Sequence, residues 1–241
     1  MSLSESEGAR PFLTSPDAGC HGAAHPPRTP YAGGVSSPGF YERHVLPRML
    51  DWAMRQVNDE RTATLADARG EVLEIGFGTG LNLRHYPAGL TRLVTVDPLV
   101  GLDARVSARI AQAPFPVERH RHRAEAGLPF DAARFDRAVM TWTLCSIAEP
   151  ERALAEIRRV LKPEGRLLFI EHGLADDARL ARWQRRVTPL WKRVSGGCHL
   201  DRAIDRLIES AGFRCEKLER FRHPHAPAIA AQLYRGVARP G

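Results

Sequence analysis

The chain has 241 residues, 43% of them hydrophobic, which is enough to fill a core and excludes disorder throughout. Its formal charge is +7, from 35 Lys and Arg against 28 Asp and Glu, a mildly basic balance that could favour anionic lipids or nucleic acids. The four cysteines are widely spaced, with no CxxC pair and no zinc-ligand spacing, so we expect a reduced, cytoplasmic protein without disulfides or a metal site. No run of about 18 apolar residues predicts a membrane span.

Residues 1–39 are rich in Ser, Pro, Gly and Ala and are predicted to form a disordered tail before a single domain at 40–241. A helical pattern covers 40–57, and from Glu71 short apolar runs alternate with helical segments. This alternation predicts an α/β fold with a parallel sheet covered on both faces. Strands are expected at 72–75, 92–97, 115–120, 136–141, 166–171, 214–221 and 229–238, and further helices at 80–86, 101–112, 150–161 and 200–211.

A glycine loop follows the first predicted strand. Gly76, Gly78 and Gly80 have the spacing GxGxG, and Leu81 stands where a dinucleotide fingerprint would need its last glycine. Glycine lets the backbone approach a ligand closely, and a helix after the loop would point its N–H groups at that ligand. Glu74, just before the loop, is a poor neighbour for a pyrophosphate but suits a cationic ligand such as S-adenosylmethionine.

Asp97 ends the second predicted strand, 17 residues after Gly80. A carboxylate in this place can accept hydrogen bonds from both ribose hydroxyls. Dinucleotide and S-adenosylmethionine sites share this feature, so it predicts an adenosine ligand without separating the two.

Longer motifs extend these observations. The stretches AEAGLPFDAARFDRAVMTWTL (124–144) and EPERALAEIRRVLKPEGRLLFIEH (149–172) resemble class I S-adenosylmethionine-dependent methyltransferases of the small-molecule branch that includes ubiquinone and menaquinone methyltransferases. HYP (85–87), LCSI (144–147), IEHG (170–173) and SGGCHLDR (195–202) are similar to alkyl-thiol S-methyltransferases. The resemblance implies a Rossmann-like class I methyltransferase fold, with a seven-stranded, mostly parallel sheet, helices on both faces and S-adenosylmethionine as cofactor.

The resemblance also implies a set of cofactor-binding positions at the ends of the first four strands. Glu74 would lie near the methionine ammonium, Asp97 would bind the ribose, and Glu125 would lie beside the adenine. Arg123 stands where many relatives carry an acidic residue, so the adenine contact is expected from the backbone or from Glu125. The full set is Glu74, Gly76, Gly78, Gly80, Asn82, Asp97, Pro98, Leu99, Ala124, Glu125, Thr141 and Trp142.

Candidate catalytic residues follow the fifth strand. Glu171 ends that predicted strand and His172 follows it, and His172 could stabilise or deprotonate an acceptor, although it could equally cap the strand end. His199 lies in a Gly-Gly loop that could fold over the pocket. Cys145 is expected to be a small buried residue rather than a participant. Methyl transfer needs mainly orientation of the acceptor, and no nucleophilic side chain is expected.

Residues 178–194 predict a basic amphipathic helix. One face carries apolar side chains, and the other carries six bases and no acid. The pattern is typical of a helix at a membrane interface, of a lid over the acceptor, or of an ordinary docked helix. The apolar residues are Leu180, Trp183, Val187, Leu190, Trp191 and Val194.

These observations predict methyl transfer from S-adenosylmethionine to a small-molecule acceptor, with a thiol favoured over a quinone precursor or an amino-lipid. A nucleic-acid-binding protein on the same fold is the alternative from another class. The sequence lacks the aromatic platform and the concentrated basic stripe of such proteins, so no nucleic-acid partner is expected. Leu81 and the absence of a plausible Tyr/Lys or His/Arg catalytic pair argue against a nicotinamide-dependent oxidoreductase. The sequence does not predict an oligomeric state.

Overall fold

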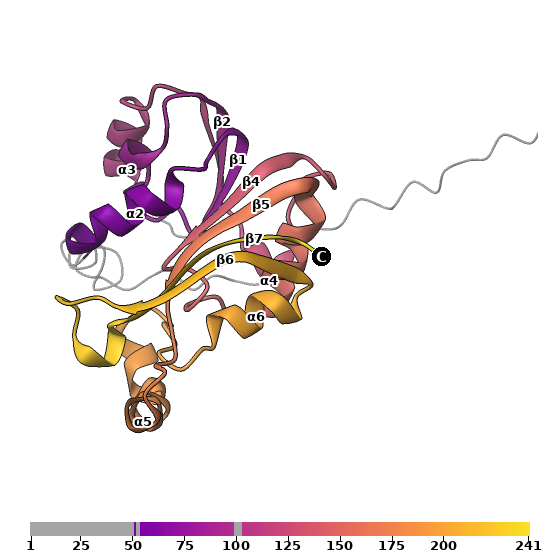
Figure 1. The fold of residues 1–241 in the computed structure, drawn as a ribbon. Coiled ribbons are helices and arrows are strands. Elements are labelled where there is room, and N and C mark those ends of the chain that lie inside the picture. Colours follow the sequence, from indigo (N-terminus) through magenta and orange to yellow (C-terminus); the bar gives the residue numbers. More distant parts are fainter. Residues whose placement is uncertain (1–50, 52–53, 99–102) are drawn as a thin grey trace, which may run out of the picture. The chain divides into compact units, whose positions relative to one another are not determined.

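The computed structural model describes residues 51, 54–98 and 103–241, all of which belong to one compact unit, Val35–Gly241. The predicted tail at 1–39 and most of the predicted helix at 40–57 lie outside the described residues. The described chain contains a seven-stranded sheet in the order β3-β2-β1-β4-β5-β7-β6 (Figure 1). This architecture confirms the predicted α/β fold class.

Five strands of the sheet run parallel. β1 pairs with β2 and β4, β2 pairs with β3, and β4 pairs with β5, whereas β7 is antiparallel to both β5 and β6. The carboxyl ends of the five parallel strands therefore lie along one edge of the sheet. The strands are β1 (Gly70–Ile75), β2 (Leu90–Val96), β3 (Val117–His120), β4 (Phe135–Thr141), β5 (Leu161–His172), β6 (Phe213–Arg222) and β7 (Gln232–Pro240).

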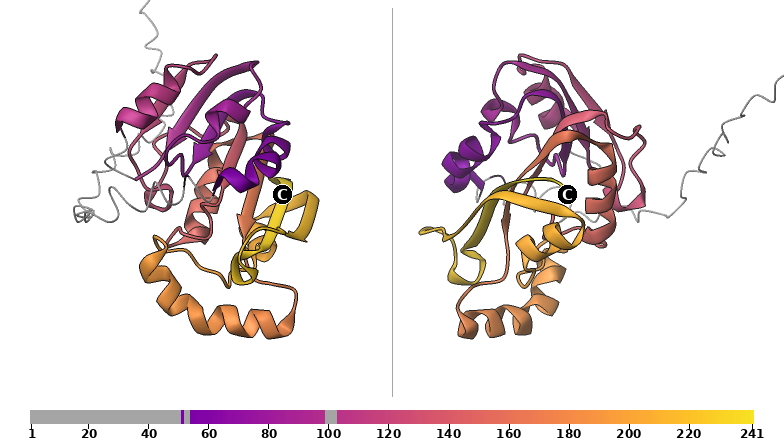
Figure 2. Two further views of the ribbon diagram at one scale, coloured as in Figure 1. Left: turned by 90° about the vertical axis from the view of Figure 1, so that its left-hand side faces the viewer. Right: turned by 45° about the vertical axis from the view of Figure 1, so that its right-hand side comes forward.

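Helices cover both faces of the sheet. α4 and α6 lie on one face, and α2 and α3 lie on the other (Figures 1 and 2). The α-helices are α2 (Asn58–Leu65), α3 (Asp103–Ile110), α4 (Pro150–Val160), α5 (Ala178–Val194) and α6 (Ile204–Ser210). Short 3-10 turns are η2 (Met54–Val57), η3 (Leu83–His85), η4 (Ala124–Ala126) and η5 (Ala228–Ala230).

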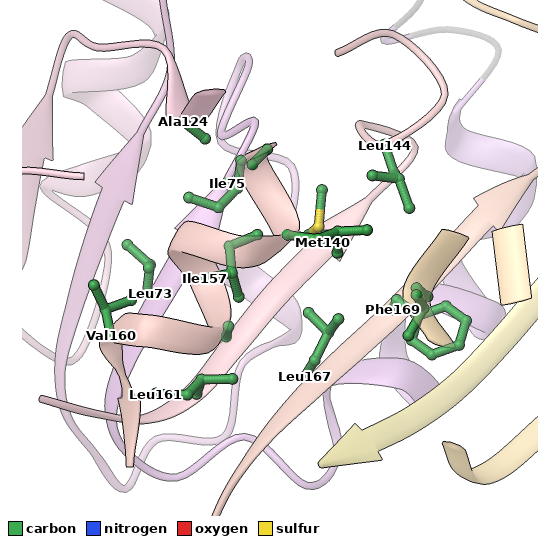
Figure 3. Close-up of a cluster of buried hydrophobic side chains, with 14 of the residues drawn as sticks. Leu73, Ile75, Ala124, Met140, Leu144, Ile157, Val160, Leu161, Leu167 and Phe169 are labelled. Atoms are coloured by element: carbon green, nitrogen blue, oxygen red, sulfur yellow. The ribbon is translucent and has the colours of Figure 1, made fainter. Parts of the chain in front are cut away.

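Side chains of each strand alternate between the two helix layers. Leu73 and Ile75 of β1 pack toward α4, whose Ile157 and Val160 are fully buried (Figure 3). Val72 points to the opposite face, toward the cluster that contains residues of α2 and α3. By the same alternation Glu74 lies on the face of Val72. The sheet therefore presents a carboxylate to the α2 side, one residue before β1 ends.

The predicted helix at 80–86 is wrong. Only the 3-10 turn η3 forms there, and Tyr86 already has an extended backbone. Pro87 explains the difference, because a proline disfavours helical torsions in the residue before it. The expectation that helix N–H groups follow the glycine loop is therefore wrong as well.

α2 was not predicted from the sequence. Its buried residues are Arg61, Thr64 and Leu65, so two of the three side chains that face the interior are polar. Without an apolar stripe, the segment has no helical periodicity to detect. The remaining expected helices are in place, although the last one is shorter, Ile204–Ser210 rather than 200–211.

Candidate active site

The candidate site lies where the parallel strands end. The strand order changes direction between β1 and β4, and open α/β sheets bind ligands outside the carboxyl ends at such a point. β1 leads into the glycine loop, and Asp97 follows β2 directly. Thr141 and His172 are the last residues of β4 and β5. Most of the sequence-predicted positions therefore share this edge.

Two glycines of the loop are needed for different reasons. Gly76 has φ +78°, and a Cβ there would lie 2.1–2.7 Å from side-chain atoms of Thr143. Gly78 has φ +54°, and a Cβ there would meet nothing within 4 Å. Its N–H donates a 2.6 Å hydrogen bond to Asp97 Oδ2. Gly76 therefore permits close packing, whereas Gly78 leaves open space beside the carboxylate of Asp97.

The loop is held from two sides at Thr79. The Thr79 hydroxyl donates to Asp51 Oδ1 at 2.5 Å, and Arg109 of α3 donates to the Thr79 carbonyl at 2.6 Å. Arg109 also pairs with Asp51 at 3.2 Å. Gly80, at φ +77°, donates its N–H to the Phe77 carbonyl at 2.9 Å and closes the turn. These contacts fix the loop without a following α-helix.

A buried polar network adjoins the loop at Glu74. Its two oxygens accept hydrogen bonds from Asn82 Nδ2 at 2.7 Å and from the Tyr86 hydroxyl at 2.8 Å. Burial raises the pKa of Glu74 to about 7, although both hydrogen bonds and Arg61 oppose this shift. Burial also raises the pKa of Tyr86 well above its usual value. Glu74 can therefore exchange a proton, or pair with a cation, near neutral pH.

Arg61 of α2 supplies the positive member of this network. Its guanidinium donates to Asn82 Oδ1 and, at 3.3 Å, to Thr141 Oγ1, and it lies 4.9 Å from the centroid of the Trp142 ring. Arg61 is 3% exposed. Burial lowers the pKa of Arg61 to about 10, so the group stays charged at neutral pH. Asn82 thus bridges a buried cation and a buried anion.

Trp142 has an unusual backbone conformation, with φ +51°. Its N–H donates to the Ile170 carbonyl at 2.9 Å, which continues the pairing of β4 with β5 past Thr141. A residue other than glycine in this region is strained, and such strain clusters at functional sites. The turn after β4 therefore has the character of a site rather than of a simple connection.

The other predicted cofactor positions lie farther along the edge. Ala124 is buried in η4, and Glu125 pairs with Arg123 at 3.5 Å, beyond the end of β3. Pro98 is exposed beside Asp97, and Leu99 lies outside the described residues. The structure thus joins Glu74, Asn82 and Thr141 in one network and Gly78 to Asp97, and it places Glu125 on a separate strand end.

Glu171 holds the turn after β4. It is fully buried, and its oxygens accept the backbone N–H groups of Thr143 and Leu144, each at 2.8 Å, and of Cys145 at 3.3 Å. Burial raises the pKa of Glu171 despite these donors. A catalytic function for Glu171 stays a prediction, whereas its contacts are those of a positioning residue.

His172 adjoins two cysteines. Its Nε2 lies 2.7 Å from Cys198 Sγ, and the Trp191 indole donates to the same sulfur at 3.4 Å. The ligand atoms of Cys145, His172 and Cys198 all lie within 4.8 Å of one another. The hydrogen bond with Cys145, followed by burial, raises the pKa of Cys198. Cys145 is buried as predicted, but it belongs to a cluster.

His199 lies beside this cluster through its backbone. Its N–H donates to the Cys145 carbonyl at 2.8 Å, while its ring lies 3.6 Å from the Asp201 carboxylate. Burial and nearby positive charges, chiefly Arg202, lower the pKa of His199. Its predicted catalytic role stays a prediction.

Sequence reasoning missed Arg61 and Tyr86, and it placed Cys198 in the Gly-Gly loop without its partners. Arg61 has no motif around it, and only its burial and contacts identify it. Tyr86 and Cys198 stand in HYP and SGGCHLDR, two motifs that mark the resemblance but reveal no contact by themselves. The three members of the sulfur and imidazole cluster come from three separate connections, so no local spacing indicates it.

Comparisons with known proteins identify the family of the chain. Residues 73–169 match the family described as methyltransferase domain. The thiol S-methyltransferase TMT1B of Rattus norvegicus is 33% identical over 156 residues, which are 61% of this chain and 62% of that protein. The phosphatidylethanolamine N-methyltransferase of Cereibacter sphaeroides is 30% identical over 172 residues, which are 69% of this chain and 82% of that protein. The chain thus spans less than two thirds of the thiol methyltransferase.

A solved structure shares the fold. It is the 1,6-didemethyltoxoflavin-N1-methyltransferase of Burkholderia thailandensis, with bound 1,6-didemethyltoxoflavin and S-adenosylhomocysteine. The TM-score is 0.56 at 16% identity, over 79% of this chain and 80% of that chain. At this identity the similarity concerns the fold alone.

Proposed function

The chain belongs to the S-adenosylmethionine-dependent methyltransferase family, and from this premise we propose that it transfers a methyl group to the sulfur of a small-molecule thiol. The observation that carries the methyl-donor half of this proposal is the buried pair of Glu74 and Arg61, bridged by Asn82 beside the glycine loop. A buried anion and a buried cation at this spacing suit a ligand that is itself a zwitterion. The methionine end of S-adenosylmethionine is such a group.

The residues present fit this cofactor. Asp97 would hold the ribose hydroxyls, since its carboxylate already accepts a backbone N–H from the loop and open space adjoins Gly78. Glu74 would pair with the ammonium group of the methionine end, and Arg61 with its carboxylate. Trp142, strained and stacked under Arg61, would form the wall toward the acceptor.

When bound, the cofactor would supply a methyl group activated by its sulfonium, and the acceptor thiol would lose its proton to solvent. The chain has to orient the acceptor and exclude water, which can supply most of the acceleration. Glu171 fixes the turn at 143–145 through three hydrogen bonds. Arg202, which donates to the carbonyls of Leu144 and Ile147, brings a positive charge that favours a thiolate.

The choice of a thiol is supported by the name of the TMT1B relative. An amino-lipid is the second candidate, because the N-methyltransferase relative matches a larger share of its own length. A quinone precursor is the third, since it requires the same donor half.

We further propose that the enzyme works in the cytoplasm and touches an anionic membrane surface through α5. Trp183, Leu190 and Val194 are 59%, 65% and 53% exposed. α5 carries six bases and no acid, and it lies apart from the helix layers that cover the sheet (Figure 2). Apolar and cationic side chains on one exposed helix suit a lipid interface. None of the described helices is long and apolar enough to cross a membrane.

The test is a panel of small thiols, amino-lipids and quinols, each incubated with S-adenosylmethionine labelled in its methyl group. We expect saturable labelling of a thiol, with loss of cofactor binding in Asp97→Ala. If an amine or quinol is labelled and no thiol is, the acceptor assignment is wrong while the family assignment stands. Salt-sensitive oligonucleotide binding without any methylation would favour the nucleic-acid alternative.

A further inference from the structure

A cluster of two thiols and one imidazole lies at the carboxyl ends of β4 and β5. Cys145 comes from the turn after β4, His172 from the end of β5, and Cys198 from the connection between α5 and α6. Their ligand atoms lie within 4.8 Å of one another. Cys145 and Cys198 are 2% and 8% exposed. We propose that Cys145, His172 and Cys198 bind one zinc ion and leave a fourth coordination position for the thiol acceptor.

The two cysteine-bearing connections are fixed to each other before any ion binds. The His199 N–H donates to the Cys145 carbonyl at 2.8 Å. Arg202, four residues after Cys198, donates to the carbonyls of Leu144 and Ile147 on either side of Cys145. These bonds use backbone carbonyls and do not involve the sulfur atoms of Cys145 and Cys198. The cluster is therefore built into the fold.

The distances are near those of a tetrahedral site. Zinc binds sulfur at about 2.3 Å and imidazole nitrogen at about 2.0 Å, which places neighbouring ligand atoms about 3.5–3.8 Å apart. His172 Nε2 and Cys198 Sγ, at 2.7 Å, would have to separate by about 0.8 Å. The other pairs, within 4.8 Å, would have to close by at most about 1.3 Å. Side-chain rotations can supply both movements.

The ligand set also indicates the kind of ion. Two thiolates and one imidazole suit zinc, and three protein ligands with a fourth open position are typical of catalytic rather than structural zinc sites. On binding, the two cysteine thiols would lose their protons to solvent, and the resulting thiolates would balance the charge of the ion. The Trp191 indole N–H, 3.4 Å from Cys198 Sγ, can donate to the bound thiolate.

The open position gives the site a function, and this part of the inference rests on the proposed thiol acceptor. A thiol that binds zinc loses its proton to solvent and is held as a thiolate. Its sulfur would be oriented at the edge shared by β4 and β5, next to the donor half of the site. Zinc would thus select sulfur over amine or quinol oxygen.

Metal binding can be measured without the methylation reaction. The full chain, reduced and freed of metal with a chelator, is titrated with Zn²⁺ and with Co²⁺. We expect one ion per chain by elemental analysis and, with Co²⁺, the visible bands of a tetrahedral site together with thiolate charge-transfer absorption. A reduced wild-type chain that binds no stoichiometric ion, or one whose Cys145 and Cys198 only form a disulfide, overturns the proposal.

Variants locate the site. Cys145→Ser and Cys198→Ser should each weaken zinc binding by more than the roughly 10–100-fold that loss of an outer-shell partner costs, and should remove the charge-transfer band. Cys215→Ser, in β6 and outside the cluster, is the matched control and should keep both. Retained S-adenosylmethionine binding shows that a variant is folded. Unchanged metal binding in both cluster variants would refute the assignment.

A spectroscopic titration of the Co²⁺ form with thiols tests the zinc site separately from the proposed function. Addition of a small thiol to the Co²⁺ form should shift its visible spectrum, and an amine of similar size should not. A spectrum that no thiol changes refutes the open position. A metal-loaded chain whose spectrum responds to thiols, but which methylates none of them, would refute the proposed acceptor and would still support the zinc site.

Discussion

The Tyr86 hydroxyl donates a 2.8 Å hydrogen bond to Glu74 Oε2, and both side chains are buried. Burial nevertheless raises the pKa of Glu74 from 4.5 to about 7. Between these two values the folded chain holds a proton that the unfolded chain has released. The contribution of Glu74 to the free energy of unfolding therefore falls as the pH rises from about 4.5 to about 7, and it is constant above that pH.

Glu74→Gln should flatten this dependence, because the amide carries no titrating proton and can still accept from Tyr86. The difference between wild type and variant should change by roughly 3 kcal/mol between pH 4.5 and 7. Urea unfolding at several pH values measures it. If both proteins show the same slope, Glu74 does not titrate in this range.

Cofactor affinity should depend on the same proton. The ionised form of Glu74 is the one that pairs with an ammonium group, so affinity for S-adenosylmethionine should increase from pH 6 to 7.5, by up to about tenfold per pH unit below 7. Calorimetric titration in two buffers should detect a released proton. In Glu74→Gln binding should be weaker and independent of pH. Equal pH dependence in the variant would assign the proton to another group.

Arg61→Met should lower the affinity for S-adenosylmethionine only by removing the contact with the methionine end of the cofactor. The substitution removes the cation and leaves Asn82 Oδ1 without its buried donor, which should also cost about 1–3 kcal/mol of stability. Affinity for S-adenosylmethionine should fall, while affinity for 5′-methylthioadenosine, which lacks the amino-acid group, should be unchanged. Fluorescence titration with both ligands makes the comparison. An equal loss for both would give Arg61 a purely structural role.

Gly76→Ala and Gly78→Ala form a matched pair. Both positions have positive φ, which costs an alanine about 1–3 kcal/mol, but only Gly76 would also collide with Thr143. Gly76→Ala should therefore lower the melting temperature more, and Thr143→Ala should partly rescue it. Gly78→Ala should fold and lose cofactor affinity, because the new methyl group fills the space beside Asp97. Comparable melting temperatures for the two single variants would contradict the collision.

The exposed face of α5 should bind anionic vesicles. The full chain should float with vesicles that contain phosphatidylserine, less with neutral ones, and less at high salt. Trp183→Ser with Leu190→Ser should reduce flotation by removing the apolar anchors. Arg182→Glu with Arg186→Glu should abolish it, whereas Arg206→Glu on the exposed side of α6 is the charge control. Flotation that none of the α5 substitutions changes would refute this contact.

The strands and α4 could be predicted because their apolar residues recur with the period of the element they form. Leu154, Ile157 and Val160 line one side of α4, and each is fully buried. α2 has no such pattern, since one of its three buried residues is Arg61. The segment after Gly80 has a helical pattern, but Pro87 disfavours helical torsions in Tyr86 and the helix does not form. Local spacing describes one segment at a time and misses these cases.

The candidate site divides in the same way. The glycine loop and Asp97 follow consecutive strands with a characteristic separation, so the sequence alone leads to the proposed donor half. The acceptor half depends on how the connections after β4, β5 and α5 meet, which brings Cys145 to Cys198 across 53 residues of chain. Nothing local to either cysteine indicates that meeting.

The way α5 is attached has a consequence for turnover. The helix is held at its centre by Gln184, whose amide bonds the backbone of Gly173, Ala175 and Ile229, while Trp183, Leu190 and Val194 are exposed. Water can replace amide hydrogen bonds at little net free energy, whereas it cannot replace a packed apolar surface. Movement of α5 away from the sheet would break these hydrogen bonds but would not expose Trp183, Leu190 or Val194, which are exposed already. The parallel strands that would hold the cofactor would keep their pairing during such a movement.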